Sequence, residues 1–149
     1  MFKHILLPTD GSPLATRGAK AGIRLAKALG ARVTALYVAA PFMPPVYSDA
    51  ASMYMPTATL RDYEKAAKAQ GAKALGAVER DAAAAGVRCS TVQVTEPQAW
   101  QGILKVARAK KCDAIAMASH GRGGLGGLIL GSATARVLAH SKIPVLVIR

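Results

Sequence analysis

Short apolar runs alternate along this chain with longer segments in which apolar residues recur every three or four positions. Such runs favour strands buried on both faces, and strands that alternate with helices favour a mostly parallel sheet covered on each side. We therefore predict an α/β fold with an open five-stranded parallel sheet and helices on both faces. The expected strands are residues 3–8, 32–38, 87–94, 113–118 and 145–148. The third alternates apolar and polar residues, as a strand near an edge would.

Helix start and stop signals separate these strands. Ser12 has the side chain of an N-cap, Pro13 suits the first helical position, and Gly30 suits a helix stop. Further helices are expected over residues 60–85, beyond residue 97, and over residues 133–140. The residues expected along one side of the longest helix are Tyr63, Ala67, Ala74, Val78 and Ala82.

The length and hydropathy favour one domain. The chain has 149 residues, 52% of them hydrophobic, so we expect a single domain spanning residues 1–149. No apolar run approaches the roughly 18–20 residues of a membrane span, and the first residues lack a signal-peptide cleavage site. We expect a cytoplasmic protein without membrane contact, in which Cys89 and Cys112 are free thiols.

The formal net charge of +12 would attract phosphate-rich partners of any kind. The basic residues are scattered, however, and no aromatic residues interleave with them in a recognisable nucleic-acid motif. Nucleic acid is therefore not expected as the main partner. One basic group lies at helical spacing opposite an apolar face, which is typical of a solvated surface: Arg17, Lys20, Arg24 and Lys27.

Several other features have mainly structural interpretations. His4 and His140 are expected to be surface or capping histidines, and Trp100 is expected in the core. The segment from Ala39 to Thr57 is rich in Pro, Met and Tyr and fits no regular period. Its length marks it as either functional or mobile.

A glycine-rich stretch, residues 117–133, joins the fourth expected strand to the last helix. A helix N-terminus presents free backbone N–H groups and a positive dipole end, and glycine lets an anion approach the backbone closely. Gly121, Gly131 and the Ser132 hydroxyl, together with the Arg122 guanidinium, therefore favour an anion site over a merely tight turn. The stretch is neither a Walker loop, whose lysine it lacks, nor a dinucleotide fingerprint.

Asp10 and His120 are two further candidate site residues. Asp10 follows the first strand, where a carboxylate could accept a hydrogen bond from a ribose hydroxyl or an exocyclic amine but would repel phosphate. We assign it to the nucleoside end of a ligand, with a turn or helix-capping aspartate as the alternative. For His120, inside the glycine-rich stretch, a phosphate contact and a structural hydrogen bond are both open.

Four motifs resemble the universal stress protein family. They are Ile-Leu-Leu-Pro-Thr-Asp-Gly-Ser near the start, Ala-Leu-Tyr-Val in the second strand, Ala-Ser-His-Gly with nine residues before Gly-Ser, and a terminal Ile-Pro-Val-Leu-Val-Ile. The resemblance spans residues 2–149. Nucleotide-binding members carry Gly, two residues, Gly, nine residues, then Gly and Ser or Thr. Gly121, Gly131 and Ser132 match this spacing, whereas the first position holds Ala118, whose methyl group could narrow the pocket.

This resemblance implies the strand order 3-2-1-4-5, homodimers built through the last strand from Pro144 to Arg149, and ATP or AMP as the ligand. It implies adenine near Asp10 and Val38, and ribose near Asp10 and Ala118. It also implies phosphates on Gly121, Gly131 and Ser132, and these phosphates could hold Mg²⁺. The full binding set that we expect is Pro8, Thr9, Asp10, Val38, Met117, Ala118, Ser119, His120, Gly121, Arg122, Gly131, Ser132 and Ala133.

Three functions follow from these observations: a regulatory, non-catalytic nucleotide-binding module in stress response, a slow ATP hydrolase, and a nucleotide-free dimeric interaction protein. The glycine-rich stretch holds no carboxylate that could position a water molecule, and Asp10 is assigned to the far end of the ligand. We therefore favour the regulatory module. The sequence does not indicate which stress, pathway or protein partner is involved.

Overall fold

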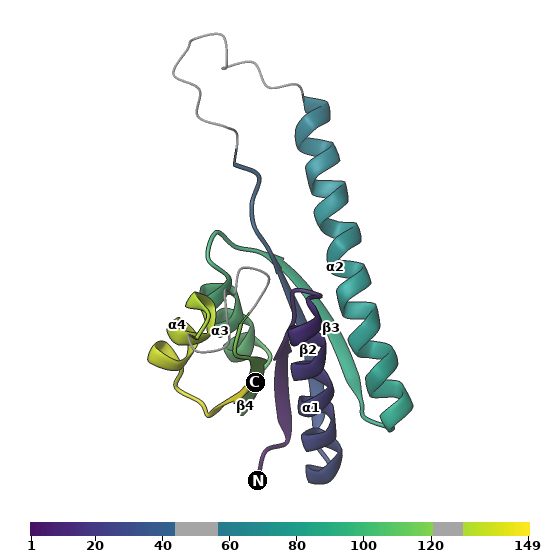
Figure 1. The fold of residues 1–149 in the computed structure, drawn as a ribbon, viewed down its shortest axis with the longest axis vertical. Helices are drawn as coiled ribbons and strands as arrows, with labels where there is room; N and C mark the ends of the chain where they lie inside the picture. Colours follow the sequence, from purple (N-terminus) through teal and green to yellow (C-terminus); the bar gives the residue numbers. More distant parts are fainter. Residues whose placement is uncertain (44–56, 121–129) are drawn as a thin grey trace.

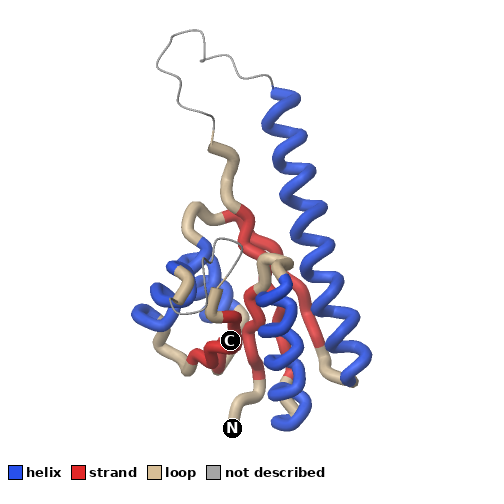
Figure 2. The backbone as a smooth tube through the Cα atoms, in the orientation of Figure 1, coloured by secondary structure: helices blue, strands red, loops and turns tan. Residues whose placement is uncertain are grey.

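Five parallel strands form one sheet in the order β3-β2-β1-β4-β5 (Figures 1 and 2). In this computed structural model, the described residues are 1–43, 57–120 and 130–149. The predicted fold class and strand order are confirmed, and no strand departs from its predicted bounds by more than two residues. The strands are β1 (His4–Pro8), β2 (Arg32–Ala39), β3 (Cys89–Thr95), β4 (Ala114–Ala118) and β5 (Val145–Ile148).

Helices cover both faces of the sheet, two on each side (Figure 1). One face carries α1 (Pro13–Leu29) and α2 (Thr57–Ala85), and the other carries α3 (Ala99–Ala109) and α4 (Ser132–His140). Within the described part of the chain, no helix has the length and apolar character needed to cross a membrane.

The capping residues of α1 are those predicted from the sequence. Ser12 Oγ accepts a hydrogen bond of 3.1 Å from the Ala15 N–H, and Pro13 is the first helical residue. Gly30 ends the helix with a φ of 63°, a left-handed conformation that glycine adopts without strain. The basic group predicted on the solvated face of α1 is exposed throughout: Arg17, Lys20, Arg24 and Lys27.

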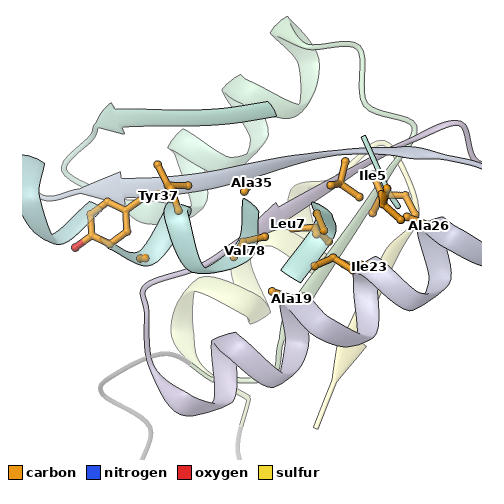
Figure 3. Close-up of a cluster of buried hydrophobic side chains, with 14 of the residues drawn as sticks. Ile5, Leu7, Ala19, Ile23, Ala26, Ala35, Tyr37 and Val78 are labelled. Atoms are coloured by element: carbon orange, nitrogen blue, oxygen red, sulfur yellow. The ribbon is translucent and has the colours of Figure 1, made fainter. Parts of the chain in front are cut away.

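Each face of the sheet has its own apolar core, because successive residues of a strand point to opposite sides. Toward α1 and α2, Ile5 and Leu7 pack with Ile23 and Val78 (Figure 3). Toward α3 and α4, the core includes Leu6, Leu36, Ile103, Ile115 and Val137. Both cysteines are free thiols, Cys89 half-buried and Cys112 buried.

One expectation about a side chain was wrong. His4 is not a surface or capping residue: it is 6% exposed, and its Nε2 lies 2.7 Å from Thr34 Oγ1 on the neighbouring strand. Tyr63 of α2 is exposed, and its hydroxyl donates to the Ala40 carbonyl at 3.0 Å. Trp100, expected in the core, is half-buried at the edge of the core beneath α3.

The irregular segment predicted from Ala39 to Thr57 falls mostly outside the described residues. Ala39 closes β2, and Met43 is exposed. Residues 44–56, which include Met53 and Met55, are among those not described, so the choice between a functional and a mobile segment stays a prediction.

Candidate functional site

The carboxyl ends of β1 and β4 lie side by side in the middle of the sheet. From β1 the chain continues to β2 on one side, whereas β4 lies on the other, so the strand order reverses between β1 and β4. Ligands of open α/β sheets bind in the crevice at such a switch point, beyond the carboxyl ends of the strands. Most of the predicted site residues follow these two strands.

The chain beyond β1 forms a tight, hydrogen-bonded turn. The Thr9 N–H donates to the Leu36 carbonyl at 2.8 Å, and the Gly11 N–H donates to Thr9 Oγ1 at 3.2 Å. Asp10 Oδ1 accepts a 2.9 Å hydrogen bond from the Ser12 N–H. The turn role considered for Asp10 is therefore present, and it holds the carboxylate at the mouth of the switch point.

The end of β4 carries two polar side chains that bond to each other. Ser119 is 3% exposed, its N–H donates to the Ile148 carbonyl at 2.8 Å, and its hydroxyl lies 3.0 Å from His120 Nδ1. His120 Nε2 is buried and has no hydrogen-bond partner within residues 1–43, 57–120 and 130–149. A buried imidazole nitrogen in this condition is a contact that a bound ligand could satisfy.

The start of α4 is fastened to the end of β4. The Gly131 N–H donates to the Ser119 carbonyl at 2.8 Å, and Thr134 Oγ1 donates to the Ala118 carbonyl at 3.0 Å. Gly131 is the N-cap and has no side chain, so it makes no side-chain capping hydrogen bond to the first N–H groups of α4. Ser132 is exposed at that helix start. The arrangement can bind an anion at the carboxyl end of β4.

Ala118 directs its methyl group at helix α1. The residue is 6% exposed, and a Cβ built on Gly18 would lie 3.2 Å from the Ala118 Cβ. Helix α1 thus passes close to β4 because position 18 has no side chain. The methyl group that could have narrowed the pocket is packed against α1 instead.

The structure brings most of the predicted binding set to one edge of the sheet. The predicted residues at or just beyond the carboxyl ends of β1 and β4, or at the start of α4, are Pro8, Thr9, Asp10, Met117, Ala118, Ser119, His120, Gly131, Ser132 and Ala133. Val38 lies near the end of β2, where its side chain faces Gly102 of α3. Gly121 and Arg122 lie outside the described residues.

Two contributors were not predicted from the sequence. Thr134 fixes α4 to β4, and Gly18 sets how closely α1 approaches β4. Thr134 lies two residues after Ser132 of the Gly-Ser motif, but its partner is a carbonyl 16 residues earlier, which only the folded chain reveals. The small residues on the inner face of α1 indicate close packing on a sheet, without indicating which strand.

A separate hollow of about 620 Å³ opens between α2 and the ends of β2 and β3, next to Tyr63 and Gln93. None of the predicted binding residues that the structure describes lines it. Among the described residues, no cluster of three or more His, Cys, Asp or Glu side chains could hold a metal ion.

Comparison with known proteins gives one family over the whole chain. The model of the universal stress protein family matches residues 1–149. A universal stress protein of Methanocaldococcus jannaschii is 34% identical over 149 residues, which cover 100% of this chain and 83% of that protein. The universal stress protein YxiE of Bacillus subtilis is 30% identical over 149 residues and is covered completely.

Solved structures share the fold at lower identity. Universal stress protein UspA of Lactobacillus plantarum superimposes with a TM-score of 0.79 at 22% identity, covering 99% of this chain and 98% of that one. A universal stress protein in complex with cAMP gives 0.73 at 22%, with coverages of 99% and 97%. A family protein of Arabidopsis thaliana with AMP bound gives 0.66 at 17%, with coverages of 98% and 90%. At these identities the likeness concerns the fold.

Proposed function

The chain belongs to the universal stress protein family, and from this premise we propose that it binds an adenine nucleotide, ATP or AMP, as a regulatory module rather than turning it over. The observation that carries the proposal is the 2.8 Å hydrogen bond from the Gly131 N–H to the Ser119 carbonyl. That bond holds a helix start whose N-cap residue has no side chain at the switch point of the sheet, beside the residues that follow β1.

The charge distribution supports one orientation of the nucleotide. The phosphates would lie at the start of α4, against the N–H groups beyond Gly131 and the Ser132 hydroxyl, where the helix dipole favours negative charge. The nucleoside would lie toward Asp10 and Val38, because a carboxylate repels phosphate but accepts hydrogen bonds from hydroxyl and amino groups. His120 Nε2, which has no hydrogen-bond partner among the described residues, offers a further polar contact.

The alanine at position 118 does not argue against binding, because its methyl group packs toward Gly18 of α1. The AMP-bound and cAMP-bound family members support an adenine nucleotide as the class of ligand. Magnesium would arrive with the phosphates, since the described residues offer no metal-ligand cluster of their own.

Slow turnover at most is expected from this arrangement. Among the proposed site residues, Asp10 is the one carboxylate, and its Oδ1 already accepts the Ser12 N–H in the turn. We expect phosphate release from ATP far below the roughly 1–100 s⁻¹ of kinases.

Calorimetric titration of the full chain with ATP, AMP and adenosine tests the proposal. Gly131 has φ −58° and ψ 147°, a conformation that valine adopts easily, so Gly131→Val should fold while placing a branched side chain against the phosphates. We expect this variant to lose ATP binding. Gly76→Val on α2 is the matched control, because a Cβ there meets only the Arg80 side chain at 3.5 Å.

Two alanine variants distinguish the two ends of the ligand. Asp10→Ala should weaken the binding of ATP and adenosine alike, whereas Ser132→Ala should weaken ATP binding more than adenosine binding. If the wild-type chain gives no heat with millimolar ATP, the nucleotide-free dimeric interaction protein replaces this proposal. Equal weakening of both ligands by Ser132→Ala would show that the nucleotide is oriented differently.

A further inference from the structure

A second polar pocket lies at the opposite edge of the sheet, where β1, β2 and β3 begin. It has a volume of about 350 Å³, and its polar lining consists of His4, Arg32, Thr34, Arg88, Ser90 and Lys110. We call it the amino-edge pocket, and we propose that it binds the phosphate group of a small anion, either inorganic phosphate or a phosphate monoester. The inference is independent of the nucleotide site, whose residues lie at the carboxyl ends of the strands.

The floor of the amino-edge pocket is a chain of hydrogen-bonded side chains across three strands. His4 Nε2 lies 2.7 Å from Thr34 Oγ1, which lies 2.9 Å from Ser90 Oγ. His4 and Thr34 are buried, and Ser90 is exposed at the end of this chain. When the Nε2–H donates to Thr34 and Thr34 donates to Ser90, the Ser90 hydroxyl hydrogen is left to donate to a bound anion.

His4 itself is incompletely bonded. Its Nδ1 is buried and makes no hydrogen bond of regular geometry with a described residue, although the Lys110 carbonyl lies close enough to raise the pKa of the ring. A polar atom in that condition is uncommon in a folded protein and often marks a functional contact. The floor of the amino-edge pocket therefore differs from an ordinary packed strand surface.

Three cations surround this floor. Arg32 and Arg88 directly precede the paired residues Val33 and Cys89, and the Val33 N–H donates to the Arg88 carbonyl at 2.8 Å, so the arginines are neighbours, Arg32 at the start of β2 and Arg88 just before β3. Like charges placed side by side on a sheet destabilise it unless an anion screens them. Lys110, after α3, adds the third positive charge.

Among the described residues, none of these three cations forms an ion pair with a carboxylate. The ion pair found there joins Lys105 to Glu96, away from the amino-edge pocket. The nearby Asp113 carboxylate is bound to the backbone, with Oδ2 at 2.7 Å from the Lys3 N–H and Oδ1 at 3.0 Å from the His4 N–H. The pocket keeps an excess of positive charge.

These features favour phosphate over other anions. Guanidinium groups match phosphate oxygens with two parallel donors, and hydroxyl groups supply further donors at the floor. The volume lies at the small end of the range for ligand pockets, roughly 300–1,000 Å³, so the site suits a compact anion better than a polymer.

NMR titration of the ¹⁵N-labelled full chain with sodium phosphate, at constant ionic strength, tests the proposal. We expect saturable shifts of the Thr34, Arg88 and Ser90 amides and of the His4 ring. Arg32→Gln and Arg88→Gln should each weaken phosphate binding about tenfold, the scale of one charge-assisted hydrogen bond. Arg24→Gln, which removes the same charge from an exposed position on α1, should leave the affinity unchanged.

A parallel titration with O-phosphoserine distinguishes the sources. Tighter binding than inorganic phosphate assigns the pocket to a phosphorylated small molecule, and equal binding assigns it to the free ion; both support the proposal. It is overturned if the shifts do not saturate at millimolar phosphate, if they occur only at Ser119 and Ser132, or if Arg24→Gln weakens binding as much. Shifts that appear with duplex DNA but not with phosphate would also overturn it. Ser90→Ala, which removes only a hydroxyl, repeats the test should an arginine variant misfold.

Discussion

The two cysteines differ in their surroundings. Cys89 is half-buried at the start of β3, whereas Cys112 is buried just before β4, within the core beneath α3. Burial raises the pKa of Cys112 from 9.0 to about 11, and the nearby Asp113 charge adds to the effect. Since the thiolate is the reactive form, Cys112 behaves as a small apolar side chain.

We predict that Cys112 reacts slowly with Ellman's reagent in the folded protein. Two pKa units reduce the thiolate fraction about 100-fold near neutral pH, and burial restricts access further. In Cys89→Ser, which retains Cys112 alone, the folded chain should react at least about 100-fold more slowly than the same chain in urea. Equal rates in both states would contradict the burial of this thiol.

His4 is a second residue whose chemistry depends on burial. Desolvation is the main cause that lowers its pKa below 6.5, and the Arg32 charge adds to it, with a smaller contribution of Lys110 in the same direction. The Asp113 carboxylate and the Lys110 carbonyl act against this shift. The folded chain therefore holds His4 neutral at a pH where the unfolded chain protonates it.

We predict that His4 makes the protein less stable as the pH falls below about 6.5. Because the unfolded state binds more protons in that range, the free energy of unfolding rises with pH there and is lost on acidification. His4→Gln, which can still reach Thr34, should flatten this dependence in urea titrations carried out in phosphate-free buffer. His140→Gln, at an exposed helix end, should leave it unchanged. An unchanged slope in His4→Gln would contradict the prediction.

At the scale of the elements, α1 packs closely on β1 and β4 because its inner face carries small residues. A Cβ on Gly18 would lie 3.1 Å from the Ala118 backbone nitrogen, and one on Gly22 would lie against the Leu7 side chain. These glycines let the helix axis approach β1 and β4 more closely than larger residues would. The position of Ala118, and with it the end of β4, depends on that approach.

We predict that Gly18→Val destabilises the protein by about 1–3 kcal/mol, because the added side chain meets backbone that cannot rotate away. The expected result is a lower urea midpoint and, through the displaced end of β4, weaker ATP binding. Lys20→Val introduces the same β-branched residue at an exposed position of α1 and controls for helix propensity. Similar midpoints for the two variants would show that α1 and β4 have room at this contact.

The elements also show what a single sequence can and cannot predict. The strands and helices were predictable because buried runs, the Ser12–Pro13 start and the Gly30 stop are local signals. The environment of His4 was not, because it depends on pairing with Thr34, 30 residues away. Tyr63 fits the apolar period of α2 but bonds to Ala40, since α2 extends beyond the sheet at this end (Figure 1). For the candidate site, the residue types were predictable from motifs, whereas the direction of the Ala118 methyl group needed the contact with Gly18.

At the scale of the whole molecule, the two ends of the sheet have different chemistry. The carboxyl ends of β1 and β4 meet the start of α4 and the Asp10 carboxylate, whereas the amino-edge pocket gathers Arg32, Arg88 and Lys110. The basic residues that produce the net charge of +12 thus do not all lie on a solvated surface, because three of them line one pocket. The two edge strands of the sheet are β3 and β5, and Leu146 of β5 is exposed.

We predict a homodimer through β5 and its flanking residues, from Pro144 to Arg149. An edge strand presents unpaired backbone groups, and a side chain such as Leu146, 46% exposed, adds apolar surface to that edge. Pairing of β5 with its two-fold mate would satisfy the unpaired backbone groups and cover the apolar surface. It would also produce a self-complementary interface. Light scattering at micromolar concentration should then give the mass of two chains.

Leu146→Lys places a charge at the centre of the interface on both chains at once and should weaken the dimer by at least about 2 kcal/mol, or roughly thirtyfold in Kd. Leu60→Lys, an exposed leucine on α2 near the other side of the sheet, should leave the mass unchanged. A wild-type chain that stays monomeric at high micromolar concentration, or a Leu146→Lys dimer as tight as the wild type, would show that the β5 edge is covered in some other way.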